Sequence, residues 1–235
     1  MNYGLPKNTQ IDKNMPKKFF YDHGGFNVKE KDFFTKSIKK ITWLYSLKTN
    51  NINVASYKDD EKEFIEIEIF KVELKSGSKI QKISEMIMQL IPYPILIEFE
   101  LEGKSAFAVE RQRINKNDST KNTIEEINIT NFEIMDKDFE KELNFTNFRY
   151  TNFLDMYSDL YHVIILKIAE DKGIKIYNYD SDLNDIIKQV NLVQDEINIE
   201  RNKIQKETQF NRKVDLNIRI KKLEQKLNKL KQGVL

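Results

Sequence analysis

The chain has 235 residues, 40% of them hydrophobic and 11% aromatic, so it can bury a sizeable core. It contains no cysteine, which excludes disulfides, thiolate metal sites and cysteine nucleophiles, and two histidines leave little for imidazole chemistry. No apolar run approaches the roughly 20 residues of a membrane span, and the start lacks the apolar core of a signal peptide. We therefore expect a cytoplasmic protein without membrane contact.

The net charge of +2 is unevenly distributed. Residues 1–50 carry ten Lys and four acidic residues, and residues 201–235 carry eleven Lys or Arg and three acidic residues. The ends are thus +6 and +8, and the rest of the chain is −12. Such asymmetry indicates contact with a polyanion or an oppositely charged partner, unless it only reflects a chain rich in Lys, Asn and Ile throughout.

Residues 1–30 are predicted to form an N-terminal arm. Pro6 and Pro16 disfavour helix at the residues before them, and the glycine pair after His23 indicates a turn. We expect His23 to be a loop residue rather than a ligand.

From Lys31 the pattern predicts a helix that ends near Asn50. Its buried face has helical spacing and consists of Phe34, Ile38, Ile41 and Tyr45. A short strand is expected at residues 52–57.

Residues 63–113 are predicted to be the centre of the fold, with a strand (63–75), a helix (78–90) and a β-hairpin (94–113). The apolar residues of the strand change face midway, which indicates either a bulge or burial on both faces. We favour a central strand buried on both faces. Ser78 is the expected N-cap of the helix.

The next stretch is predicted to contain a polar loop (115–123), a strand (124–134) and a long helix (147–170). His162 lies beside the apolar stripe of that helix, so a hydrogen-bonded helical residue is expected rather than a catalytic one.

After Gly173 apolar residues recur at alternating spacings of four and three, which is typical of coiled coils. The first series is Leu183, Ile187, Val190, Ile197 and Ile204. The second is Leu216, Ile220, Leu223, Leu227 and Leu230. The two series differ in phase, so the break at 208–212 is a turn between two helices or a stutter in one. The absence of Gly and Pro favours the stutter and the short second helix favours the turn, which we predict.

These elements predict an α+β protein with a central mixed or antiparallel sheet, packed helices, and a C-terminal helical hairpin or coiled coil. The expected parts are the arm (1–30), the α+β domain (31–178) and the C-terminal helices (179–235).

Five features together resemble domain-of-unknown-function family 4391 of bacterial, archaeal and viral proteins. They are LPK at 5–7, EIEIFKVEL at 66–74, IPY at 91–93, the β-hairpin that follows, and QFNRKVDLN at 209–217. The resemblance spans nearly the whole chain and brings no catalytic residues. It implies an accessory protein encoded near DNA methyltransferases and helicases of restriction or phage defence.

Our first hypothesis is an interaction module that binds a protein partner, or a second copy of itself, through the C-terminal helices. An apolar seam of this length must be covered. Its partner-binding residues would be Leu216, Ile220, Leu223, Leu227 and Leu230. No cofactor or metal is expected in that case.

A second hypothesis is a Mg²⁺-dependent nuclease with a restriction-endonuclease-like core. Glu73 and Lys75 have the E-x-K spacing of that fold, and Asp59 or Asp60 could supply a second carboxylate. Ordinary solvated charges at strand ends explain the same four residues.

A third hypothesis is nucleic-acid binding through basic residues of the C-terminal helices, which could contact phosphates. These residues are Arg212, Lys213, Arg219, Lys221 and Lys222. A solvated helix face explains them equally.

Overall fold

The computed structural model describes residues 1, 3–75, 79–116, 122–176 and 183–232. The chain divides into two compact units, Met1–Ile164 and Ile165–Leu235, which we call the body and the tail unit. The division falls inside a helix, upstream of the boundary expected near residue 178. The fold is α+β, as the sequence predicts.

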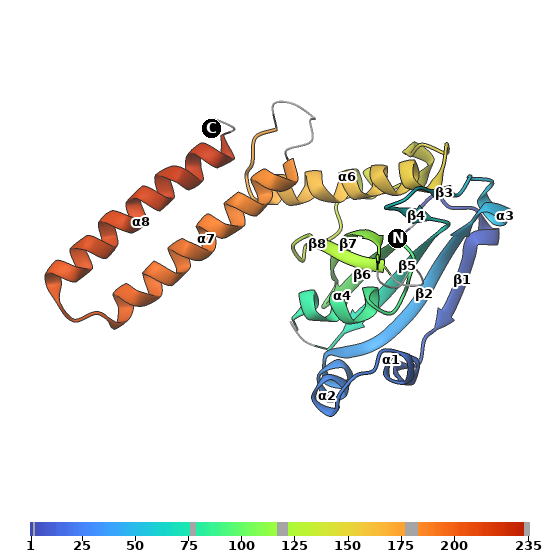
Figure 1. Ribbon diagram of the computed structural model, residues 1–235, viewed down its shortest axis with the longest axis horizontal. Coiled ribbons are helices and arrows are strands. Elements are labelled where there is room, and N and C mark those ends of the chain that lie inside the picture. Colours follow the sequence, from blue (N-terminus) through green and yellow to red (C-terminus); the bar gives the residue numbers. More distant parts are fainter. Residues whose placement is uncertain (2, 76–78, 117–121, 177–182, 233–235) are drawn as a thin grey trace. The chain divides into compact units, whose positions relative to one another are not determined.

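The body is built on a six-stranded mixed sheet in the order β1-β2-β5-β6-β7-β8 (Figure 1). Its strands are β1 (Gln10–Asn14), β2 (Ile38–Lys48), β5 (Glu66–Leu74), β6 (Ile95–Leu101), β7 (Lys104–Ile114) and β8 (Asn122–Ile129). The pair β5–β6 is parallel and every other pair is antiparallel. A second, two-stranded sheet pairs β3 (Tyr57–Lys58) with β4 (Glu63–Phe64).

The helical elements of the body are α1 (Lys17–His23), α2 (Val28–Ser37), α3 (Thr49–Ile52), α4 (Ile80–Met88), α5 (Lys137–Glu142) and the start of α6 (Phe153–Asp171), with 3₁₀ turns η1 (Lys7–Thr9) and η2 (Phe145–Asn147). Helix α4 makes the crossover between the parallel strands β5 and β6, as a parallel pair requires.

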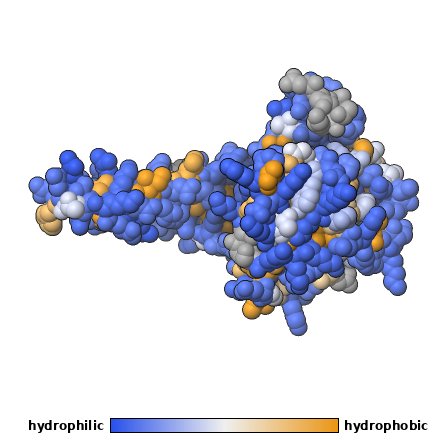
Figure 2. All heavy atoms as spheres, turned by 90° about the horizontal axis from the view of Figure 1, so that it is seen from below, coloured by the Kyte–Doolittle hydropathy of each residue, from blue (hydrophilic) through white to orange (hydrophobic). Residues whose placement is uncertain are grey.

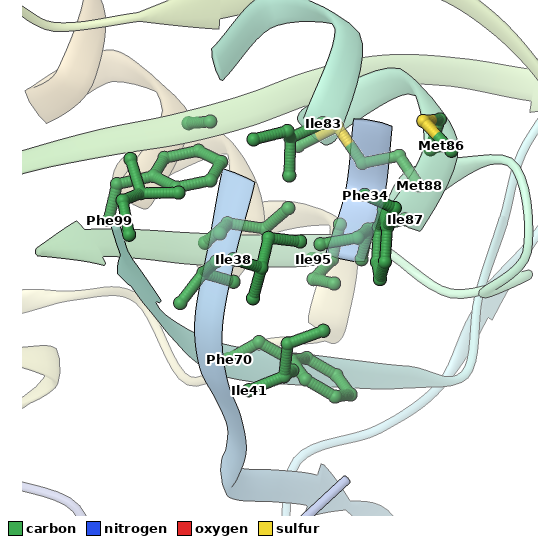
Figure 3. Packing of buried hydrophobic residues seen from close by; sticks show 14 of the residues in the cluster. Phe34, Ile38, Ile41, Phe70, Ile83, Met86, Ile87, Met88, Ile95 and Phe99 are labelled. Atoms are coloured by element: carbon green, nitrogen blue, oxygen red, sulfur yellow. The ribbon is translucent and has the colours of Figure 1, made fainter. Parts of the chain in front are cut away.

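One face of the sheet packs against α1, α2 and α4. Their contributions include Phe20, Phe34, Ile83 and Ile87, which are fully buried. Figure 3 shows Phe34 and the α4 side chains together with strand residues, among them Ile38, Ile41, Phe70, Ile95 and Phe99. Along β5 and β6 the residues of this cluster recur every two positions, which puts a continuous apolar layer beneath the helices.

The opposite face of the sheet is covered by the N-terminal residues, η2 and the start of α6. The Tyr3 hydroxyl donates to Glu98 on β6 (2.8 Å), and the Tyr3 ring packs edge-on to Phe145 of η2. The amide of Asn128 on β8 donates to the hydroxyl of Tyr161 on α6 (2.8 Å).

The predicted centre of the fold is confirmed. Strand β5 lies between β2 and β6, and its apolar residues are buried on both faces. Helix α4 follows it, and β6 and β7 form the predicted β-hairpin around the turn Glu102-Gly103. The expected N-cap Ser78 lies outside the described residues.

The N-terminal segment, predicted to be an arm, is built into the body. Strand β1 pairs with β2 and becomes an edge of the main sheet, and Tyr3 is fully buried. Helix α1 begins directly after Pro16 and ends at His23, which is therefore helical rather than in a loop. Proline is favourable at the start of a helix, so its presence did not exclude one.

The helix predicted from Lys31 to Asn50 is wrong in its second half. Helix α2 ends at Ser37, and β2 follows without a loop. The stretch ITWLYSL is rich in β-branched and aromatic residues, which favour strands, and its apolar positions satisfied both periods. The strand expected at residues 52–57 is also wrong, since α3 and β3 flank an irregular stretch there.

The tail unit contains the end of α6 and a helical hairpin of α7 (Leu183–Lys206) and α8 (Phe210–Lys231), drawn side by side in Figure 1. The predicted turn is confirmed, and residues 207–209 form it. Within the residues that the structure describes, no helix is long and apolar enough to cross a membrane.

Candidate functional site

The predicted partner-binding seam lies mostly inside the helical hairpin. Ile220, Leu227 and Leu230 are buried, and Leu216 and Leu223 are half-buried. On α7 the buried residues are Ile187, Val190, Val193 and Ile197. The two helices therefore bury one another's apolar stripes, and the prediction that the whole seam is free for a partner needs correction.

Other apolar residues of the hairpin remain exposed. Phe210, Val214 and Ile218, which we call the outer stripe, are four residues apart on α8, and Phe210 is 78% exposed. At 100° per residue the outer stripe lies on the side of α8 opposite the buried seam. On α7, Leu192 and Ile199 are exposed and lie seven residues apart. Figure 2 shows apolar atoms among hydrophilic ones along the hairpin.

A groove runs between α7 and α8 near their connecting turn. One hollow, of about 440 Å³, is lined by Lys203, Lys206, Glu207, Arg212, Asp215, Leu216 and Arg219. A second, of about 370 Å³, is lined by Glu196, Ile199, Glu200, Arg219, Lys222 and Leu223. Because both include Arg219, we treat them as one groove. It offers apolar side chains between charged ones.

The carboxylates of the groove are partly engaged. Glu200 pairs with Lys203 (2.5 Å), and Glu207 accepts hydrogen bonds from the backbone amides of Thr208 and Gln209. These amide bonds hold the pKa of Glu207 below its usual value. Glu207 also lies 3.9 Å from Arg212. Two of the four acidic side chains in the lining, those of Glu200 and Glu207, are thus held by contacts within the hairpin.

Three of the five predicted nucleic-acid-binding residues line this groove. They are Arg212, Arg219 and Lys222, while Lys213 and Lys221 are not part of its lining. The sequence analysis missed Lys203 and Lys206, which α7 brings opposite α8. Only the antiparallel pairing of the helices puts these lysines beside α8, so spacing along the chain could not reveal them.

The four nuclease candidates do not come together. Asp59 and Asp60 lie in the β3–β4 turn, where the Asp59 carboxylate accepts hydrogen bonds from the amides of Glu61 and Lys62. The backbone carbonyl of the next residue, Glu61, accepts from the amide of Ile114 at the end of β7 (2.8 Å). The two aspartates therefore lie near that end of the main sheet.

Glu73 lies at the other end of the sheet. It is in register with Glu100, which in turn is in register with Ser105 at the start of β7. Nine residues of strand separate Ser105 from Ile114, roughly 30 Å. Glu73 pairs with Lys39 (3.3 Å), and Lys75 donates to the Thr35 carbonyl (3.0 Å).

Asp59 and Asp60 are therefore too far from Glu73 for their carboxylates to bind the same metal ion. Across the part of the chain that the structure describes, no group of three His, Cys, Asp or Glu side chains could hold a metal ion.

Two buried glutamates of the body, neither of them singled out by the sequence analysis, have raised pKa values. Glu68 on β5 accepts from Ser46 (2.9 Å) and Trp43 (2.6 Å), and burial raises its pKa to about 8. Glu110 on β7 accepts from the amide of Ile95 (2.9 Å), and burial raises its pKa to about 8 as well. Both side chains are therefore largely uncharged at neutral pH.

Tyr157 of α6 lies beside Glu110, and its hydroxyl bonds to the backbones of both β6 and β7. Its hydroxyl accepts from the amide of Glu110 (3.1 Å) and lies 3.2 Å from the Ile95 carbonyl.

We expect Tyr157→Phe to lower the free energy of unfolding by about 1–3 kcal/mol, because buried backbone groups lose their partner. Chemical denaturation measures this. Tyr150→Phe, at an exposed tyrosine, is the control, and an equal effect of both substitutions would contradict the prediction.

A family model described as "Domain of unknown function (DUF4391)" matches residues 3–227. No curated protein and no solved structure matches the chain.

Proposed function

The chain belongs to the family described as Domain of unknown function (DUF4391), and we propose that this member is an accessory or assembly factor that binds a partner protein through its α7–α8 hairpin. The observation that carries the proposal is the exposure of Leu192, Ile199 and the outer stripe on a hairpin whose own seam is already covered. Exposed apolar residues at helical spacing are typical of surfaces that bind another protein.

The setting that we propose is a DNA-related system of the restriction or phage-defence type, with a DNA helicase or methyltransferase component as the partner. It rests on the family resemblance. The distance between Asp59 or Asp60 and Glu73 counts against the nuclease alternative.

Nucleic-acid binding by α8 is a second candidate function, supported by its charge. Helix α8 carries eight Lys or Arg and two acidic residues. A nucleic acid bound there would dissociate steeply as salt rises, because its phosphates would release counterions. A partner protein held by apolar contacts would depend on salt far less.

Affinity purification from the native host tests the interaction. We expect the wild-type chain to retain a partner protein at high salt, and Phe210→Ser combined with Ile218→Ser to lose it. The matched control is Val28→Ser combined with Ile134→Ser, which changes exposed apolar residues of the body. Loss of the partner in the control would contradict the proposal, and retention in the hairpin variant would exclude the outer stripe as the docking surface.

A further inference from the structure

We propose that the groove between α7 and α8 receives a helix of the partner protein, and that this helix carries acidic residues along its flanks. The inference deepens the proposed function and rests on it. It names the surface of the hairpin that is used and the chemistry of what it binds.

The apolar part of the groove has the geometry of an unfinished helix bundle. Leu216 and Leu223 lie seven residues apart, in phase with the buried seam of α8, yet both are half-buried and line the groove. Ile199 lies on the α7 wall and is 53% exposed. A third helix with an apolar ridge would cover these side chains, as a third strand does in a coiled-coil bundle.

The flank of α8 beside the groove is a stripe of cations. Arg212, Arg219, Lys222, Lys226 and Lys229 follow one another at spacings of seven, three, four and three, which puts them on one side of the helix. In coiled coils the residues that flank the apolar seam form salt bridges with the other helix, so their charges determine which helices pair. A cationic flank therefore favours a partner helix with Glu or Asp at its flanking positions.

These cations are largely unneutralised. Among the described residues, no carboxylate lies within ion-pair distance of Arg219, Lys222, Lys226 or Lys229, and Arg212 is 3.9 Å from Glu207. In the lining, two acidic residues, Glu196 and Asp215, also lack such a partner among the described residues. The five cations of the α8 stripe outnumber these two carboxylates, so the net charge beside the groove is positive.

A helix fits this groove better than a nucleic acid does. Phosphates are polar and would leave the apolar side chains of Leu216, Leu223 and Ile199 uncovered, whereas an amphipathic helix would bury them. The wall from Glu196 to Lys206 spans roughly 15 Å, which is about three turns of a partner helix. Apolar side chains between charged ones match an amphipathic helix.

Two synthetic peptides of about three heptads, labelled with a fluorophore, test the inference on the whole protein. They share a leucine and isoleucine seam, and their flanking positions carry Glu in one and Lys in the other. We expect the Glu peptide to bind and the Lys peptide to bind at least about tenfold more weakly by fluorescence anisotropy. Equal binding of both peptides, or binding of neither, would overturn the inference.

Charge reversal locates the binding site. Arg219→Glu combined with Lys222→Glu should weaken binding of the Glu peptide about tenfold or more. Lys213→Glu combined with Lys221→Glu makes the same charge change on α8 outside the lining and should leave the affinity nearly unchanged. Equal effects of the two double variants would overturn the groove as the site, as would duplex DNA that binds there in place of the Glu peptide.

The native partner separates failure of this inference from failure of the proposed function. If the groove variant retains the partner while the outer-stripe variant loses it, the groove assignment fails and docking through the hairpin stands. If only the groove variant loses the partner, the groove inference and docking through the hairpin both stand. If neither variant affects the partner, both fail.

Discussion

Raising the pH from about 5 to about 9 will destabilise the folded body, and Glu110→Gln will remove much of this loss. Burial raises the pKa of Glu110 from 4.5 to about 8, so the folded state keeps a proton that the unfolded state releases. The resulting stabilisation is fully present below pH 4.5 and disappears as the pH rises through about 8. For Glu110 the loss is at most about 4 kcal/mol over this pH range.

The comparison that decides this prediction is between wild type and Glu110→Gln at each pH. Glutamine keeps the shape and can still accept from the Ile95 amide, but it cannot ionise. Urea denaturation should give similar stabilities at pH 5 and a variant that is more stable by several kcal/mol at pH 9. Parallel curves for the two proteins across the range would show that Glu110 does not titrate in this way.

A charge placed in the seam of the hairpin will unfold it, whereas the same charge two residues away will not. Ile197 is 1% exposed and faces α8, and Ile199 on the same helix is 53% exposed. We expect Ile197→Asp to cost roughly 3–5 kcal/mol, because the buried methyl groups are lost and a charge is buried without a partner. Ile199→Asp should change stability by less than about 0.5 kcal/mol.

Circular dichroism at 222 nm during heating measures both variants. The Ile197→Asp protein should lose helical signal in an early transition that wild type and Ile199→Asp lack. Similar melting of the two variants would mean that α7 does not use its Ile197 face against α8, and that the seam is free for a partner as the sequence first suggested.

The sequence predicted elements best where its apolar spacing satisfied only one period. In the β-hairpin of β6 and β7, apolar and charged residues alternate from Ile97 to Leu101, and α4 shows helical spacing, so both were found. In β2, Ile38, Ile41 and Tyr45 have helical spacing, whereas the apolar residues from Ile41 to Leu47 also recur every two residues, as in a strand. The alternating charges that mark β5 and β6 are absent from β2. Pairing with β1 and β5, which involves distant residues, decides between the two structures.

The start of α2 is marked in the sequence by a local signal, a capping box. Asn27 and Glu30 form a capping box, in which the Asn27 side chain accepts from the Glu30 amide and Glu30 accepts from the Asn27 amide, both at 3.0 Å. The N-x-x-E spacing is visible in the sequence and would have moved the start of the helix from Lys31 to Val28.

The candidate site could be predicted only in part. The seam residues of α8 and the basic residues Arg212, Arg219 and Lys222 were identified from spacing and charge. Which of them face α7 and which face outward depends on the phase between two helices, and that phase depends on side-chain packing across the hairpin. Spacing within one helix therefore could not show that α7 buries the apolar seam of α8 and leaves the basic residues beside it exposed.

Hydrogen–deuterium exchange on the complex purified with its native partner tests the central claim most directly. We expect residues 196–223 to exchange more slowly in the complex than in the free chain, with little change in the strands of the body. Slower exchange confined to residues 3–164, with α7 and α8 unaffected, would contradict the assignment of the hairpin as the docking element.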